Sequence, residues 1–148
     1  MRTYCSLIIS SNTDAQIGVT VQRVLGLVSN EVADTHSPEL TTRREKLGRM
    51  LGITPAVPPR YFWRFSSKDI VHSSDLGDHI VWLLNQLAPS RSIDDIHEYG
   101  STAFISCFWA SNGRGGGPIL PPTLMRMLAD HGVELQFDVY VEPDDAKA

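Results

Sequence analysis

Val133-Glu134-Leu135-Gln136-Phe137-Asp138-Val139-Tyr140-Val141-Glu142 is the stretch that decides the fold class. Apolar residues alternate with polar or charged ones throughout, the pattern of a β-strand with one face toward a core and one toward water. Strands of a parallel sheet that is covered on both faces read instead as continuous apolar runs. The stretch therefore favours an α+β domain with helices packed mainly on one face of a mixed or antiparallel sheet. A doubly wound sheet is the alternative.

Three other segments predict strands by similar alternation or by aromatic content, namely residues 3–10, 60–67 and 102–110. Together with residues 133–142 they give an expected sheet of four strands. Helices are predicted over about 14–25, 38–51, 75–87 and 122–131, with a helical turn at 93–99. The segment 28–59 carries the weakest pattern. We expect a single domain over residues 1–142, followed by a frayed polar tail at 143–148.

The composition is that of an ordinary globular protein and excludes several classes. The 148 residues include 13 Lys+Arg and 17 Asp+Glu, a formal charge of −4, with 42% hydrophobic residues. No apolar run approaches the roughly 20 residues that span a bilayer. A mildly acidic chain is a poor general binder of nucleic acid. The first residues do not read as a signal peptide, so we expect a cytoplasmic protein whose Cys5 and Cys107 are reduced and buried.

Several motifs together resemble a bacterial family of domains of unknown function, the one numbered 4279. They are Val24-Leu25-Gly26-Leu27, the aromatic strand Phe62-Trp63-Arg64-Phe65-Ser66-Ser67, the helix His79-Ile80-Val81-Trp82-Leu83-Leu84-Asn85-Gln86-Leu87-Ala88-Pro89, and Phe137-Asp138-Val139-Tyr140-Val141. The resemblance covers most of the chain. It implies an α+β fold with a similar order of elements, and it implies no activity.

Motifs of catalysis and of cofactor binding find little support. The glycine-rich run 113–117 lies between a predicted strand and a predicted helix, where backbone N–H groups can bind an anion. It lacks the Lys-Ser/Thr ending of a phosphate-binding loop, and we interpret it as a connection. The five histidines form no metal-ligand pair, and His79 is expected at the surface. Cys107 lies mid-strand, where burial disfavours a reactive thiolate. We therefore expect no metal and no cofactor, and favour a role without catalysis.

A basic cluster marks the predicted helix over 38–51. Arg43, Arg44, Lys46 and Arg49 surround Glu45. We interpret the cluster as a solvated helix face, with contact to a phosphate backbone as the alternative.

The polar side of the sheet is the best candidate for a binding surface. Asp138 and Tyr140 lie on it, and Arg64 joins them if its strand presents the same face. The neighbouring strand adds either Phe104, Ser106 and Phe108 or Ala103, Ile105 and Trp109. A mixture of aromatic, arginine and carboxylate side chains is typical of interface hot spots and also of ligand clefts. A structural pairing of Asp138 with Arg64 would leave the surface without a binding role.

The sequence thus predicts a non-enzymatic protein-interaction module with Arg64, Asp138 and Tyr140 as binding residues. Its partner is another protein or a second copy, and we expect neither nucleic acid nor membrane. The alternative is a small-molecule-binding protein or small enzyme with a cleft around Asp138 and Tyr140.

Overall fold

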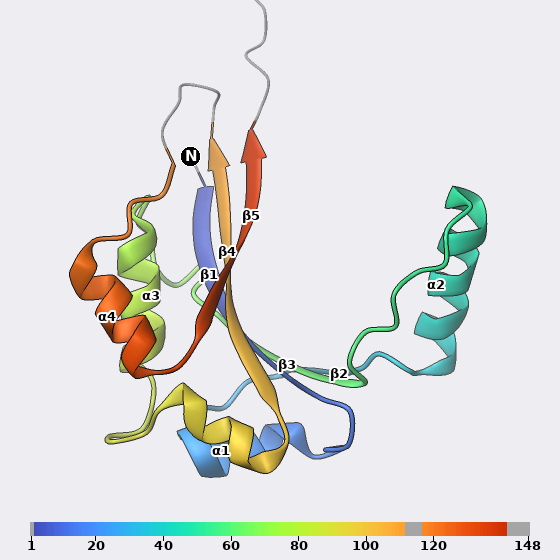
Figure 1. Cartoon of the computed structure of the whole chain (residues 1–148), viewed down its shortest axis with the longest axis horizontal. Helices are drawn as coiled ribbons and strands as arrows, with labels where there is room; N and C mark the ends of the chain where they lie inside the picture. Colours follow the sequence, from blue (N-terminus) through green and yellow to red (C-terminus); the bar gives the residue numbers. More distant parts are fainter. Residues whose placement is uncertain (1, 112–116, 142–148) are drawn as a thin grey trace, which may run out of the picture.

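The computed structural model describes residues 2–111 and 117–141, which form one mixed sheet with helices (Figure 1). The elements in chain order are β1 (Arg2–Ser11), α1 (Ile17–Leu25), β2 (Glu31–Asp34), α2 (Pro38–Leu51), β3 (Tyr61–Ser66), α3 (Leu76–Asn85), the 3-10 helix η1 (Ile93–Tyr99), β4 (Thr102–Ser111), α4 (Pro122–Asp130) and β5 (Glu134–Val141). The glycine-rich run up to residue 116 and the tail 143–148 lie outside the described residues.

The sheet has five strands in the order β2-β3-β1-β4-β5. Only β4 and β5 run parallel, while the other neighbouring strands are antiparallel. This arrangement confirms the α+β class with a mixed sheet and rules out the doubly wound alternative. The prediction of four strands was wrong because it missed β2. That strand has four residues, most of them exposed, and lies at one edge of the sheet, so it carries no pattern of burial.

The core lies on one face of this sheet, between the sheet and the helices. Alternate residues of the central strands point into it, including Leu7 and Ile9 of β1 and Ile105 of β4. Apolar residues of α1, α3, η1 and α4 complete the same core. In Figure 1, α3 and α4 lie on one side of the upper half of the sheet. Among the described residues, Trp63 of β3 is the largest fully buried side chain.

Local signals explain where the core helices begin and end. The carboxylate of Asp75 accepts a hydrogen bond from the backbone N–H of Gly77 at 2.8 Å and caps the start of α3. Helix α1 ends at Gly26, which has a φ of 73°. A Cβ at that position would lie 2.7 Å from the Cβ of Ala88. Glycine is therefore required there by the backbone and by the close approach of residue 88.

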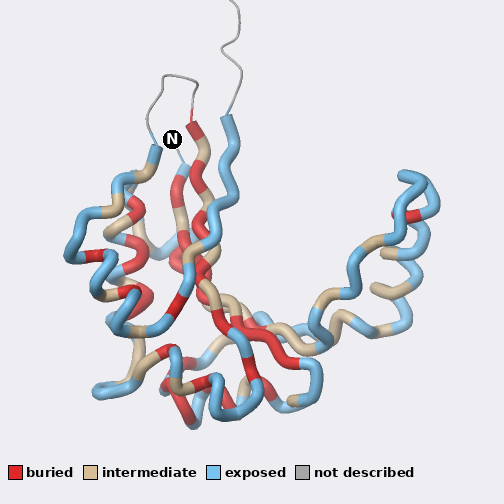
Figure 2. The backbone as a smooth tube through the Cα atoms, in the orientation of Figure 1, coloured by how far each residue is buried: buried red, intermediate tan, exposed pale blue. Residues whose placement is uncertain are grey.

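Helix α2 stands apart from the rest of the molecule, as Figure 2 shows. Gly48 is its one buried residue, while Leu47, Met50 and Leu51 are exposed. Its bounds agree with the helix predicted over 38–51. We call residues 35–60, which contain α2 and its two connections to the sheet, the arm.

Strand β5 is less buried than its alternation predicted. On the side that faces the helices, Val133 just before the strand is buried and Leu135 is half-buried. Phe137, Val139 and Val141 on the same side are 43%, 51% and 63% exposed. The expectation that these three residues face a core was wrong, because the core cluster reaches the strand only at its first residues.

Candidate functional site

The open face of the sheet, opposite the helices, carries all three predicted binding residues. The register pairs Arg64 with Ile8, Ile8 with Phe104, and Phe104 with Glu134, so these side chains lie on one face. Asp138 and Tyr140 share that face because strand side chains alternate. The neighbouring strand therefore contributes Phe104, Ser106 and Phe108, the first of the two sets left open by the sequence.

Arg64 and Asp138 are nevertheless far apart on this face. They lie three strands apart, or about 14 Å across the sheet at the usual strand spacing, and at different levels along it. Arg64 instead donates from Nε to the hydroxyl oxygen of Ser6 at 3.1 Å. Its Nε also lies 3.7 Å from a carboxylate oxygen of Glu31. The structural Arg64–Asp138 pair is therefore not formed.

A row of stacked side chains crosses the open face from β1 to β5. The rings of Tyr4 and Phe108 stack with centroids 4.8 Å apart, and those of Phe108 and Tyr140 lie 5.2 Å apart. The ammonium group of Lys68 lies 5.6 Å from the centre of the Tyr4 ring and extends the row at that end. We call Lys68, Tyr4, Phe108 and Tyr140 the aromatic row. Each ring pair contributes about 0.5–1.5 kcal/mol beyond its burial, which fixes the rings in place.

Sequence reasoning found Tyr140 and Phe108 but missed Tyr4 and Lys68. The alternation of residues 3–10 does place Tyr4 on the side opposite Cys5 and Leu7. The signal that was lacking is the register, which pairs Tyr4 with Phe108 across β1 and β4. Lys68 follows β3 and reaches the row only through the fold.

Two hollows lie beside the aromatic row on the β3 side. One, of about 540 Å³, is lined by Arg64, Ser66, Lys68, Tyr4 and the segment 28–31. The other, of about 580 Å³, shares Tyr4, Lys68 and Asp69 with the first. Asp69 has a φ of 63°, a conformation that few non-glycine residues adopt. Neither hollow is lined by Asp138 or Tyr140, which lie exposed on β5.

A serine and a histidine form a buried hydrogen-bonded pair behind the sheet. The hydroxyl group of Ser67 and Nδ1 of His79 are 2.7 Å apart. Nε2 of His79 lies 2.8 Å from the carbonyl oxygen of Ser73, which can only accept, so Nε2 carries the proton and Nδ1 accepts from Ser67. The N–H of Cys5 donates to the same hydroxyl at 2.9 Å. The expectation that His79 lies at the surface was wrong.

The contacts of this Ser–His pair resemble those of an activated nucleophile, but a substrate cannot reach the pair. Both residues are 0% exposed. A nucleophile must reach its substrate, and the base must take up and release a proton. We therefore assign Ser67 and His79 a structural role, joining β1, the end of β3 and α3.

Cys5 and Cys107 face one another across β1 and β4 inside the core. Their sulfur atoms are 3.5 Å apart, and both cysteines are free and buried. The backbone N–H and C=O groups of Cys5 bond to Ser67, so Cys5 and Cys107 form a non-hydrogen-bonded pair, the closer type of cross-strand pair. The hydrogen bond to Cys107 and burial raise the pKa of the Cys5 thiol far above its usual range. Such a thiol is a poor nucleophile.

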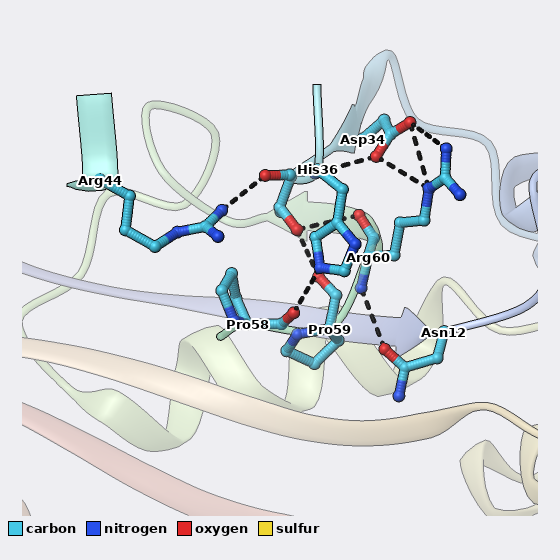
Figure 3. Close-up of polar contacts among 8 residues, drawn as sticks. Asn12, Asp34, His36, Arg44, Pro58, Pro59 and Arg60 are labelled. Atoms are coloured by element: carbon cyan, nitrogen blue, oxygen red, sulfur yellow. Dashed lines mark hydrogen bonds and ion pairs between the residues drawn. The ribbon is translucent and has the colours of Figure 1, made fainter. Parts of the chain in front are cut away.

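The base of the arm is held by polar contacts, drawn in Figure 3. The guanidinium group of Arg60 contacts the carboxylate of Asp34 at 3.2 Å. This hydrogen bond, together with one from the backbone of His36, lowers the pKa of the Asp34 carboxyl. Arg44 donates to the carbonyl oxygen of Thr35 at 2.6 Å. One member of the basic cluster therefore ties α2 to the first residue of the arm.

Two further observations bear on the kind of site. Among the described residues, no group of three or more His, Cys, Asp or Glu side chains is placed to hold a metal ion. Within the same residues, no helix has the length and apolar character needed to cross a membrane.

A comparison with protein-family models matches residues 38–142 to the family DUF4279, described as a domain of unknown function. The match covers more than half of the chain, so the chain belongs to this family, and the resemblance is confirmed. It begins at α2 and leaves out the motif Val24–Leu27 together with β1, the central strand. No curated protein and no solved structure matches this chain.

Proposed function

We propose that this DUF4279 domain is a protein-interaction module that binds a polypeptide on the open face of its sheet. The observation that carries the proposal is the aromatic row, which spans three adjacent strands on the face opposite the helical layer. Aromatic and arginine side chains on one solvent-facing surface are the usual anchors of protein interfaces.

The geometry of the row favours a polypeptide over a base or sugar. Flat ligands stack on free ring faces. Here Phe108 lies between Tyr4 and Tyr140, and Lys68 lies over Tyr4, so Phe108 and Tyr4 have neighbours against their ring faces. Ring edges, with the hydroxyl groups of the tyrosines, suit the backbone and apolar side chains of a protein partner.

The charges on either side of the row indicate what such a partner carries. Arg64 and Lys68 lie at the β3 side, whereas Asp138 lies on β5 at the other side. A complementary polypeptide places an acidic residue near Arg64 and Lys68 and a basic residue near Asp138. Opposite charges at these two ends fix the orientation of the partner and speed its association.

The test is capture of a partner followed by titration of that purified partner. Wild-type protein is used as bait in a lysate of its source organism at low salt, beside the variants Tyr140→Ala and Arg64→Glu. A partner of this face then binds wild type in solution and binds Tyr140→Ala roughly tenfold or more weakly, the loss typical of a hot spot. Met50→Ala is the control, because Met50 is 74% exposed on α2, outside the open face.

A partner that binds all four proteins equally overturns the proposal, as does the absence of any partner that titrates. Circular dichroism and thermal unfolding show that each variant is folded. Charge reversal supplies a second test. The Arg64→Glu variant should bind a partner whose matching acidic residue has been changed to lysine.

The hollow of about 540 Å³ supports a second candidate, binding of a small anion beside Arg64 and Lys68. The same hollow is also lined by Glu31 and Asp69, so its charges are mixed. A thermal-shift screen against phosphate and small carboxylates, repeated with Arg64→Gln, tests this candidate. Stabilisation of wild type that is lost in the variant supports it, and no stabilisation by any anion refutes it.

A further inference from the structure

Among the described residues, no strand pairs with the outer edge of β5. Strand β5 is the last strand in the order β2-β3-β1-β4-β5, so its outer N–H and C=O groups face away from β4. Natural proteins protect such edges with short strands, lysine, proline or a covering segment. The opposite edge meets this rule, because β2 has four residues and its Asp34 pairs with Arg60. Strand β5 has eight residues and contains neither lysine nor proline.

No described segment covers the apolar side of β5 either. Phe137, Val139 and Val141 lie side by side on it and are each at least 43% exposed. Figure 2 shows this strand in the colour of exposed residues along most of its length. A long edge strand with an exposed apolar side is a surface that other strands can join.

We propose that β5 pairs antiparallel with β5 of a second copy, around a two-fold axis at Phe137, so that two sheets join into one of ten strands. Such a contact is isologous, because the same residues meet from both copies. The inference goes beyond the proposed function. It uses the edge of the sheet, whereas the polypeptide partner uses the open face.

In this register, the side chains of the two β5 strands are complementary. On the apolar side, Phe137 faces its own copy and Leu135 faces Val139. On the polar side, Gln136 faces Asp138 and Glu134 faces Tyr140. Each carboxylate therefore meets a neutral side chain that can donate a hydrogen bond to it.

The neighbouring registers are worse for reasons of charge and length. An axis at Asp138 places that carboxylate against its own copy, and an axis at Gln136 places Glu134 against Asp138. Like charges directly opposite one another destabilise a strand pair. An axis at Val139 avoids this repulsion but pairs only residues 137–141 of the described strand. The axis at Phe137 pairs residues 133–141.

The first experiment measures the mass of the full-length protein in solution over a wide range of concentration by sedimentation and light scattering. We expect a monomer–dimer equilibrium that is weakened at least tenfold by Val139→Lys, because a charge then enters the apolar side of the junction. The matched control is Val32→Lys on β2, where the valine is 49% exposed against 51% for Val139. The control should dimerise like wild type.

The second experiment tests the register by cross-linking under oxidised glutathione. In F137C the two introduced thiols face each other at a cross-strand distance that a disulfide can bridge. The thiols form one disulfide and release two molecules of reduced glutathione. In Y140C the introduced thiol faces Glu134 of the second copy, so it should not form the dimer cross-link. Native Cys5 and Cys107 are buried and do not interfere.

A protein that stays monomeric at every concentration overturns the inference. Equal weakening by Val139→Lys and Val32→Lys also overturns it, as does cross-linking of Y140C as efficient as that of F137C. These experiments use the purified protein alone, so their outcome is separate from the capture of a polypeptide partner.

Discussion

The two facing cysteines of the core, Cys5 and Cys107, show how contacts and burial set the reactivity of a single side chain. Because the pKa of the Cys5 thiol is raised by its contact with Cys107 and by burial, very little Cys5 thiolate exists near neutral pH, and Cys107 is buried as well. We expect iodoacetamide to leave both cysteines of the folded protein unmodified and to modify both in denaturant. Mass spectrometry of the intact protein gives the count. Rapid labelling of the native wild type would contradict this expectation, while M50C, at an exposed position of α2, serves as a control that must be labelled.

Two buried serines differ in what their hydroxyl groups contact, and they should respond differently to removal of that group. Ser67 contacts His79 and the N–H of Cys5, whereas the hydroxyl oxygen of Ser101 has no partner among the described residues. Ser67→Ala leaves two buried polar groups unpaired and should lower the free energy of unfolding by about 2–3 kcal/mol. Ser101→Ala removes an unpaired group and should be neutral or stabilising. Urea unfolding measures both, and equal losses would show that the Ser67–His79 pair contributes nothing specific.

Among the secondary-structure elements, those with a buried face were predictable and those without one were not. Helical spacing of apolar residues predicted α3 and alternation predicted β1 and β4, because burial imposes a period on the sequence. Strand β2 has no buried residue and joins the sheet through its backbone, so it left no pattern. The same limit applies to the site. The alternation placed Tyr140 on the polar side, but the meeting of Tyr4 with Phe108 depends on register.

The glycine of α1 and the glycine of α2 test how differently these two helices are packed. A Cβ at Gly18 of α1 would meet only Val32, at an ordinary 3.6 Å. Gly18→Ala should therefore raise the free energy of unfolding by up to about 1 kcal/mol through helix propensity. A Cβ at Gly48 of α2 would lie 2.6 Å from Pro55 and 2.8 Å from the carbonyl oxygen of Ile53.

Gly48→Ala should therefore loosen the arm while leaving the core intact. The readout is amide hydrogen exchange at Ile53, whose N–H donates to the carbonyl oxygen of Gly48 at 3.0 Å. Faster exchange there, with little change in the global free energy of unfolding, is the expected result. A stabilising effect of Gly48→Ala equal to that of Gly18→Ala would show that α2 does not pack against Pro55.

At the scale of the whole molecule, two parts are held by different forces. Apolar side chains from four helices and the sheet form one core, to which α2 adds no side chain. The arm is held at its base by the exposed Asp34–Arg60 ion pair and by a hydrogen bond from the N–H of Arg60 to the side chain of Asn12, just after β1. Burial is insensitive to pH, whereas an ion pair depends on the charge of both partners. Acid should therefore act on the arm before it acts on the core.

The pKa of Asp34 sets the pH range of this effect. Its carboxyl has a lowered pKa in the fold, because Arg60 and the backbone of His36 donate to the charged form. The ordinary value in an unfolded chain is about 3.9. A lowered pKa in the fold means that the stabilising contribution is complete above the unfolded value and is lost as the pH falls through the folded one. The arm should thus loosen below about pH 4.

Amide exchange at Thr35 is the measurement, since its N–H donates to the carbonyl oxygen of Arg60 at 2.7 Å. The protection of Thr35 should fall in acid while that of Ser67, which donates to Cys5 in the core, is retained. In Asp34→Asn the ion pair is absent at every pH, so Thr35 should exchange faster than in wild type near neutrality and show no further loss in acid. High salt should weaken the wild-type contact in the same direction, because the pair is exposed and screened. A pH profile of Thr35 that is identical in wild type and Asp34→Asn would show that the ion pair does not hold the arm.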